Sequence, residues 1–169
     1  MCQFVESIKI ENGEVRNIAL HNERLNRTRF EVLKQTSHID LHNILTDLPK
    51  QPGTYKCRVL YREDVEKVEY KPYTLPKINN IRAVVADNVD YSYKYANRES
   101  INSLKKNIAE DDIIIVKHGL VTDCSFTNIA FFDGSRWYTP NTPLLKGTKR
   151  ELLLKNKVIF EKQIKAEDI

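Results

Sequence analysis

Apolar and polar positions alternate along the first part of the chain in a way that predicts paired strands. Residues 3–19 alternate on both sides of Glu11-Asn12-Gly13, and Asn-Gly favours the tight turn of a β-hairpin. Residues 54–62 and 65–72 flank a polar turn and are rich in β-branched and aromatic residues. The pattern therefore predicts two strand pairs before residue 73.

Between these pairs the apolar spacing changes to that of a helix. One helix is predicted over about 21–35 and a second over about 41–48, which Pro49 and Pro52-Gly53 end. The positions that share one face of the first helix are Leu25, Thr28, Arg29 and Val32. Residues 1–72 are therefore predicted to form a small α+β lobe.

A proline-containing stretch predicts the boundary of this lobe. Pro72 and Pro76 prevent the stretch around them from lying inside a sheet, so residues 73–78 are predicted to connect the first lobe to a second one, residues 79–169. In the second lobe, strands are predicted at 81–86, 112–117, 128–132 and 158–164, and helices near 97–109 and 145–155.

Composition limits the class of protein. The 169 residues suffice for one domain or two small lobes, and 41% hydrophobic residues can fill a core. No stretch approaches the roughly 20 apolar residues of a membrane span, and the start lacks the order of a secretory signal, so we expect a cytoplasmic protein. Cys2, Cys57 and Cys124 lack ligand spacing, so neither a disulfide framework nor a metal site is predicted.

The charge does not indicate a macromolecular partner. The net charge of +4 is spread along the chain, so nucleic acid is not predicted as a partner. A membrane is not predicted either, because the chain lacks a long apolar stretch. The segment Tyr91-Ser-Tyr93-Lys94-Tyr95 has an alternative interpretation as a stacking platform for single strands. No recognised nucleic-acid motif accompanies it, so this alternative is the weaker one.

Two segments are candidates for binding a phosphate group. The guanidinium of Arg24 can bind phosphate through two hydrogen bonds, although on this segment alone a solvated helix face explains it better. Gly147-Thr148-Lys149 directly precedes an apolar helix, where exposed amides form an anion site, and the alternative is a plain glycine turn. Thr127 and Asn128 are weaker candidates for further bonds to the same group.

Asp123 and Lys94 are the candidates for the chemistry itself. Asp123 lies among small and apolar residues, where an unpaired carboxylate is costly, so it needs a partner. That partner is either a protonated ring nitrogen or neighbouring backbone amides in a cap. The amine of Lys94 can form a Schiff base with an aldehyde, although any surface lysine would look similar in the sequence.

The order of these segments resembles the class IV aminotransferases, which are the fold type IV pyridoxal 5'-phosphate (PLP) enzymes. The resemblance spans nearly the whole chain, and its motifs are Arg24-Leu25 after a histidine, Lys94-x-x-Asn97, Val-Thr-Asp123-x-x-x-x-Asn128-Ile, Thr139-Pro140 and Leu-x-Gly147-x-x-Arg150. The family includes branched-chain and D-amino-acid aminotransferases and aminodeoxychorismate lyase. This compact chain looks most like the lyase branch.

The resemblance implies a two-lobe architecture of the α+β or α/β class, with the cofactor PLP in the cleft and a homodimer closing it. Lys94 would be the catalytic Schiff-base lysine, and Asp123 would face the pyridine nitrogen. Arg24 would bind the cofactor phosphate. The backbone would help at Thr127, Asn128, Gly147, Thr148 and Lys149.

Three departures from the family pattern stand out. Asp123 replaces a glutamate, Lys149 replaces a small hydroxyl or apolar residue, and the family normally continues past residue 169. The lyase would release pyruvate from aminodeoxychorismate and yield 4-aminobenzoate, a reaction of folate biosynthesis. The alternatives are a D- or branched-chain amino acid aminotransferase and a non-catalytic relative that binds cofactor or partner. A small amino-bearing substrate is expected, but the sequence does not select it.

Overall fold

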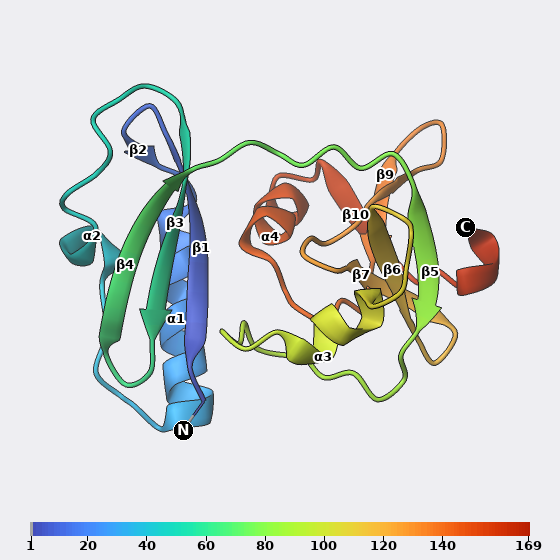
Figure 1. Ribbon diagram of the computed structural model, residues 1–169, viewed down its shortest axis with the longest axis horizontal. Helices are drawn as coiled ribbons and strands as arrows, with labels where there is room; N and C mark the ends of the chain where they lie inside the picture. The colour runs from blue at the N-terminus through green and yellow to red at the C-terminus, as the bar shows by residue number, and fades with distance from the viewer. Residues whose placement is uncertain (1) are drawn as a thin grey trace. The chain divides into compact units, whose positions relative to one another are not determined.

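The structure, a computed structural model, describes residues 2–169 (Figure 1). These residues form two compact units, which are described separately. Unit 1 comprises the residues up to Leu75 together with Tyr93–Asn97, and unit 2 comprises Pro76–Ser92 and Arg98–Ile169. Each unit combines strands with helices, in agreement with the predicted mixed α/β class.

Unit 1 is built on an antiparallel sheet with the strand order β2-β1-β3-β4. Its strands are β1 (Phe4–Glu11), β2 (Glu14–Val15), β3 (Thr54–Tyr61) and β4 (Val65–Pro72). Asn12 and Gly13 have φ values of 51° and 80°, as the primed hairpin turn between β1 and β2 requires. Both predicted strand pairs are confirmed, although β2 has only two residues.

The two helices of unit 1 are α1 (Ile18–Leu33) and α2 (Leu41–Ile44). The predicted face of α1 is confirmed: Leu25, Thr28 and Arg29 are buried, and Val32 is partly buried against the core. Helix α2 ends earlier than predicted, since Leu45 leaves the helical region at φ −91° and ψ 63°. The side chains that form the core of this unit include Phe4, Ile8, Ile10, Leu25, Leu41, Val59 and Tyr61.

A short segment from later in the chain completes unit 1. The carbonyl of Lys94 accepts a hydrogen bond from the N–H of Val5 at 2.9 Å, and Phe4 forms a β-bridge with Tyr95. The sequence predicted this segment in the lobe 79–169. Because pairing between residues about ninety positions apart leaves no local signal, the structure alone places Tyr93–Asn97 beside β1.

Unit 2 contains two three-stranded sheets, ordered β5-β6-β7 and β10-β9-β8. The first pair in each sheet is parallel and the second antiparallel. The strands are β5 (Ile81–Val85), β6 (Asp112–Lys117), β7 (Leu120–Cys124), β8 (Phe131–Phe132), β9 (Trp137–Pro140) and β10 (Ile159–Lys162). The helices are α3 (Glu99–Asn102), α4 (Thr148–Lys155) and the 3-10 turns Ser103–Lys105 and Ala166–Asp168.

Three predictions in unit 2 need correction. The helix predicted near 97–109 is shorter, because Lys106 is extended and Asn107 adopts φ 66°. The strand predicted at 128–132 is reduced to β8, and β7, which carries Asp123, was not predicted. Helix α4 begins at Thr148 rather than at 145, since Gly147 is extended at ψ 139°.

Three further observations concern the whole described chain. None of the helices within residues 2–169 is long and apolar enough to cross a membrane. The same residues contain no group of three or more His, Cys, Asp or Glu side chains placed to hold a metal ion. Cys2 is an exposed free thiol, and Cys57 and Cys124 are buried free thiols.

Candidate functional site

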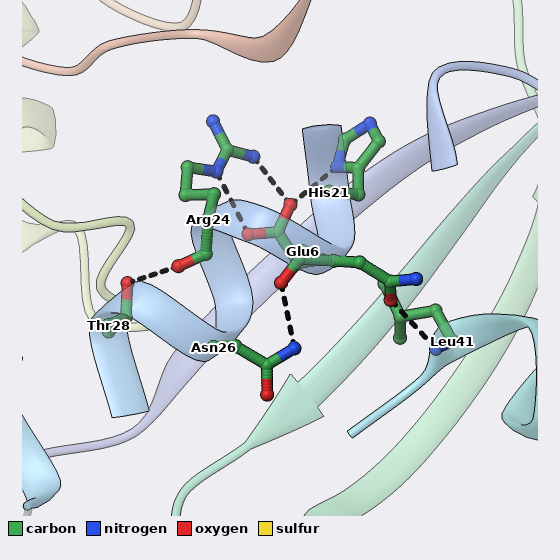
Figure 2. A network of polar contacts seen from close by, with 7 residues as sticks. Glu6, His21, Arg24, Asn26, Thr28 and Leu41 are labelled. Carbon is green, nitrogen blue, oxygen red and sulfur yellow. Dashed lines mark hydrogen bonds and ion pairs between the residues drawn. The ribbon is translucent and has the colours of Figure 1, made fainter. Parts of the chain in front are cut away.

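In unit 1, Arg24 belongs to a buried ionic cluster with Glu6 and His21 (Figure 2). Arg24 donates from Nε to Glu6 Oε1 at 2.9 Å and from Nη2 to Glu6 Oε2 at 2.5 Å, and His21 Nδ1 lies 2.6 Å from the same Oε2. The Arg24 residue is only 6% exposed. The solvated helix face that the sequence left open is therefore wrong for Arg24.

Helix α1 and strand β1 generate this cluster together. His21 and Arg24 are three positions apart on α1, so they project from the same side of the helix. Glu6 lies on the face of β1 that also carries Phe4, Ile8 and Ile10, all of which are buried. The sequence reasoning missed Glu6, although a charged residue at an inward position of an alternating strand is a usable signal.

The charge of Arg24 determines the ionisation of Glu6. Burial raises the pKa of Glu6, but the nearby Arg24 charge and the hydrogen bonds from His21 and Arg24 outweigh it, and the pKa is lowered to about 2. Glu6 is therefore an anion at neutral pH. It accepts from Nε and Nη2 of Arg24 and so fixes the plane of the guanidinium group.

Lys94 is held in unit 1 through its backbone. Its carbonyl is bonded to the N–H of Val5, the residue directly before Glu6, and Ala96 N–H donates to the Gln3 carbonyl at 2.8 Å. Lys94 is half-buried. Strand β1 thus positions two candidates that are seventy residues apart in the chain, Arg24 through a side chain and Lys94 through the backbone.

In unit 2, Asp123 lies near the end of β7 and is 6% exposed. Its Oδ2 accepts from the Leu145 N–H at 3.0 Å, and its Oδ1 accepts from Asn128 Nδ2 at 2.7 Å. Burial raises the pKa of Asp123 to about 6, although these hydrogen bonds, another from the Leu144 backbone and the charge of Arg150 lower it. The capping partners that the sequence left open are therefore present.

These hydrogen bonds do not exhaust the carboxylate. A carboxylate offers roughly four acceptor sites, and the N–H donors on Asp123 come from Leu145, Asn128 and Leu144. About one further donor can therefore be accommodated. Capping and contact with a ring N–H are compatible at this carboxylate.

The remaining predicted residues of unit 2 surround Asp123 and the start of α4. The carbonyl of Thr127 accepts from Cys124 N–H at 2.9 Å, and this turn brings Asn128 back beside Asp123. Gly147 is the N-cap of α4 and provides no side-chain cap to the first turn, where Thr148 is buried and Lys149 is exposed. The N–H groups at the start of a helix point toward its N-terminal end, as an anion site requires.

Arg150 has a structural role that the sequence analysis did not assign. Its Nη2 donates to the carbonyl of Pro140 at 2.9 Å and to Glu161 Oε1 at 2.6 Å, so it joins α4 to β9 and β10. The side chain is buried, and its charge also lowers the pKa of Asp123. These two bonds join residues ten and eleven positions apart, so local sequence reasoning could not predict them.

Comparison with known protein families identifies one family. The model of the amino-transferase class IV family matches residues 3–169 of this chain. An uncharacterized protein of Haemophilus influenzae is 37% identical over 174 residues, which cover 100% of this chain and 92% of that protein.

Two further proteins resemble this chain. A crystal structure from Haemophilus somnus 129PT, provisionally named 4-amino-4-deoxychorismate lyase, has a TM-score of 0.91 and 32% identity, and the match covers 99% of this chain and 90% of that one. A Schizosaccharomyces pombe protein, provisionally named aminodeoxychorismate lyase, is 31% identical over 105 residues, which are 57% of this chain and 45% of that protein.

Proposed function

The chain belongs to the class IV aminotransferase family, a family of PLP-dependent enzymes, and from this premise we propose that it binds PLP and acts as an aminodeoxychorismate lyase. In this proposal Lys94 binds the cofactor aldehyde, Arg24 binds the phosphate and Asp123 binds the ring nitrogen. The start of α4, with Gly147, Thr148 and Lys149, and the turn with Thr127 and Asn128 assist at the phosphate.

The observation that best supports the proposal is that both charged candidates are buried and already oriented. Arg24 and Asp123 are each 6% exposed, and each is held by at least two hydrogen bonds within its own unit. Such preorganisation suits a binding site, because little side-chain entropy remains to be lost when a ligand is bound. Neither residue has the environment of an ordinary surface charge.

The residues also fit the charges of PLP. The guanidinium of Arg24 can donate in its plane to phosphate oxygens, and Glu6 restricts the directions in which it does so. Asp123 has acceptor capacity for about one further donor, such as a pyridinium N–H. An ion pair with that N–H would favour the ionised carboxylate and so offset the effect of burial.

When bound, PLP would supply an electron sink for a substrate carbanion. Lys94 would provide the amine that condenses with the aldehyde and releases one water molecule. Once substrate displaces it, the same amine would take up the substrate proton as a general base. Asp123 would keep the ring nitrogen protonated.

The visible absorption spectrum of the protein mixed with PLP tests cofactor binding. We expect a visible band that borohydride removes, and we expect Lys94→Ala to abolish it while the far-UV circular dichroism is unchanged. Lys77→Ala, at an exposed position, is the matched control and should keep the band. A borohydride-sensitive band retained in Lys94→Ala would assign the covalent bond to another lysine.

Two assays on one preparation distinguish the proposed reaction from its alternatives. Pyruvate release from aminodeoxychorismate, without accumulation of the amine form of the cofactor, is the result expected of the lyase. Conversion of bound cofactor to its amine form by D- or L-amino acids would instead identify an aminotransferase. Cofactor binding with neither reaction would favour a non-catalytic relative.

The names of the two similar proteins at 31% and 32% identity favour the lyase over the aminotransferase. Both the Haemophilus somnus structure and the Schizosaccharomyces pombe protein carry provisional lyase names.

We further propose that the protein is a cytoplasmic homodimer, and sedimentation equilibrium of the purified protein tests its oligomeric state. A monomer that is fully active at assay concentration would contradict the dimer.

A further inference from the structure

Asn128 connects Asp123 to the segment before α4 through a single side-chain amide. Its Nδ2 donates to Asp123 Oδ1 at 2.7 Å and to the carbonyl of Leu145 at 2.8 Å, while the Leu145 N–H donates to Asp123 Oδ2 at 3.0 Å. The carboxylate, the amide and the backbone N–H and C=O of one residue, Leu145, thus form a closed ring of hydrogen bonds. Each oxygen of Asp123 is bound from a different direction, so the plane of the carboxylate is fixed.

Gly147 provides the space that this amide needs. Its φ of about −75° suits any residue, so the backbone conformation does not require glycine. A Cβ at this position would lie 2.0 Å from Asn128 Oδ1 and 3.2 Å from Asn128 Cγ. The first contact is far inside van der Waals distance, so a side chain at 147 would displace the amide from Asp123.

We propose that Asn128 is a positioning residue for Asp123, and that Gly147 is glycine in order to admit the Asn128 amide beside the carboxylate. This role differs from the backbone contact to phosphate considered above. It rests on the proposed function only in the statement that the carboxylate serves a cofactor. The link between Asn128, Gly147 and Asp123 is a property of the protein without cofactor.

Few groups other than the Asn128 amide stabilise the ionised form of Asp123. The charged group that acts on Asp123 is Arg150 of α4, which is itself engaged with Glu161 of β10 and the Pro140 carbonyl. The neighbouring thiol of Cys124 has a pKa raised to about 11, mainly by burial, so it is neutral at physiological pH. Loss of the amide therefore removes a donor from a buried carboxylate that has few other sources of stabilisation.

The test is an NMR titration of the side-chain carboxyl carbons in cofactor-free protein with labelled aspartate, with the Asp123 signal assigned through Asp123→Asn. We expect Asn128→Ala to raise the pKa of Asp123 by about one unit, because a hydrogen bond to the ionised form is lost. Gly147→Ala should raise it similarly. Asn141→Ala, which removes an exposed amide of unit 2, is the matched control and should leave it unchanged.

The double variant gives the decisive comparison. In the Asn128→Ala background the space beside residue 147 is empty, so adding Gly147→Ala should have little further effect on the pKa or on the midpoint of thermal unfolding. Independent, additive effects of the two substitutions would overturn the proposal, as would an unchanged pKa in both single variants. If Asn128→Ala does not fold, the titration of Gly147→Ala decides alone.

Failure of the proposed function would look different. A protein that binds no PLP, and yet shows the expected titration shifts, would lack the proposed cofactor but keep the positioning link. A protein that binds PLP through Lys94, but shows no shift at Asp123, would keep the function and lose the inference. The cofactor spectrum and the carboxyl titration therefore report on the two proposals separately.

Discussion

Two buried carboxylates in this protein have opposite ionisation behaviour. Glu6 in unit 1 is completely buried, yet its pKa is lowered to about 2, whereas Asp123 in unit 2 is slightly exposed and its pKa is raised to about 6. Burial raises the pKa of both groups. The difference arises because Glu6 has a bidentate bond to Arg24, while Asp123 is held by neutral N–H donors with Arg150 acting only through its charge.

The comparison separates two ways of preparing a charged site. At Glu6 the carboxylate is an anion at neutral pH that orients a cation, and the two charges largely compensate each other. At Asp123 the hydrogen bonds fix the direction of the carboxylate but do not provide a full counter-charge. A cationic group of a ligand would neutralise the charge of Asp123 in the way that Arg24 neutralises the charge of Glu6.

The largest effect is expected when the compensated pair is broken. Glu6→Gln keeps the size of the side chain but leaves the Arg24 charge buried beside a neutral amide. We expect the free energy of unfolding, measured by urea denaturation, to fall by about 3–5 kcal/mol. Glu66→Gln, which removes an exposed partner of Arg62, is the control and should remain near wild type. A Glu6→Gln protein of wild-type stability would contradict the compensation.

The free energy of unfolding at acidic pH should depend on the ionisation of Glu6. Its folded-state pKa is lowered from 4.5 to about 2, so its contribution is fully present above pH 4.5 and is lost as the pH falls toward 2. A shift of this size corresponds to about 3 kcal/mol. The wild-type free energy of unfolding should therefore fall across this window, and Glu6→Gln should reduce that slope. An identical slope in the two proteins would show that other groups cause it.

The contribution of Asp123 to stability should have the opposite pH dependence, and it should change in a different pH range. Its folded-state pKa is raised from 3.8 to about 6, so the stability that its protonated form contributes is present below pH 3.8 and is lost as the pH rises through 6. This corresponds to a cost of about 3 kcal/mol in cofactor-free protein at pH 7. Unfolding measured between pH 4 and 7 should show this loss in wild type but not in Asp123→Asn. Saturation with PLP should also diminish it if the proposed ion pair forms.

The smallest effect tests the geometry of Arg24 rather than its charge. Arg24→Lys retains a cation near Glu6 but lacks the planar fork, so we expect PLP affinity to fall about tenfold. Arg27→Lys is the matched control. Arg29, the other neighbouring arginine, is unsuitable because it is buried and donates to the carbonyl of Glu63 at 2.7 Å. Equal losses for Arg24→Lys and Arg27→Lys in a PLP titration would indicate a generally basic helix.

The sequence by itself determined the elements whose information is local. Alternation around Asn12-Gly13 specified the first hairpin, and the helical spacing of Leu25, Thr28 and Arg29 specified the buried face of α1. The order of the motifs identified the family, which the family match over residues 3–169 confirms. These features depend on neighbours within a few positions, or on the order of residues along the chain, and both are visible without a structure.

Tertiary structure alone decided the partners of the candidate residues. The bond from Val5 to Lys94, the Glu6–Arg24 pair and the closure of Asn128 on Asp123 and Leu145 join residues whose pairing has no local signature. The need for glycine at 147 was also invisible, since its φ is ordinary and its constraint comes from Asn128. Local sequence encodes backbone preference, whereas desolvation, charge compensation and steric fit depend on which distant side chains the fold brings together.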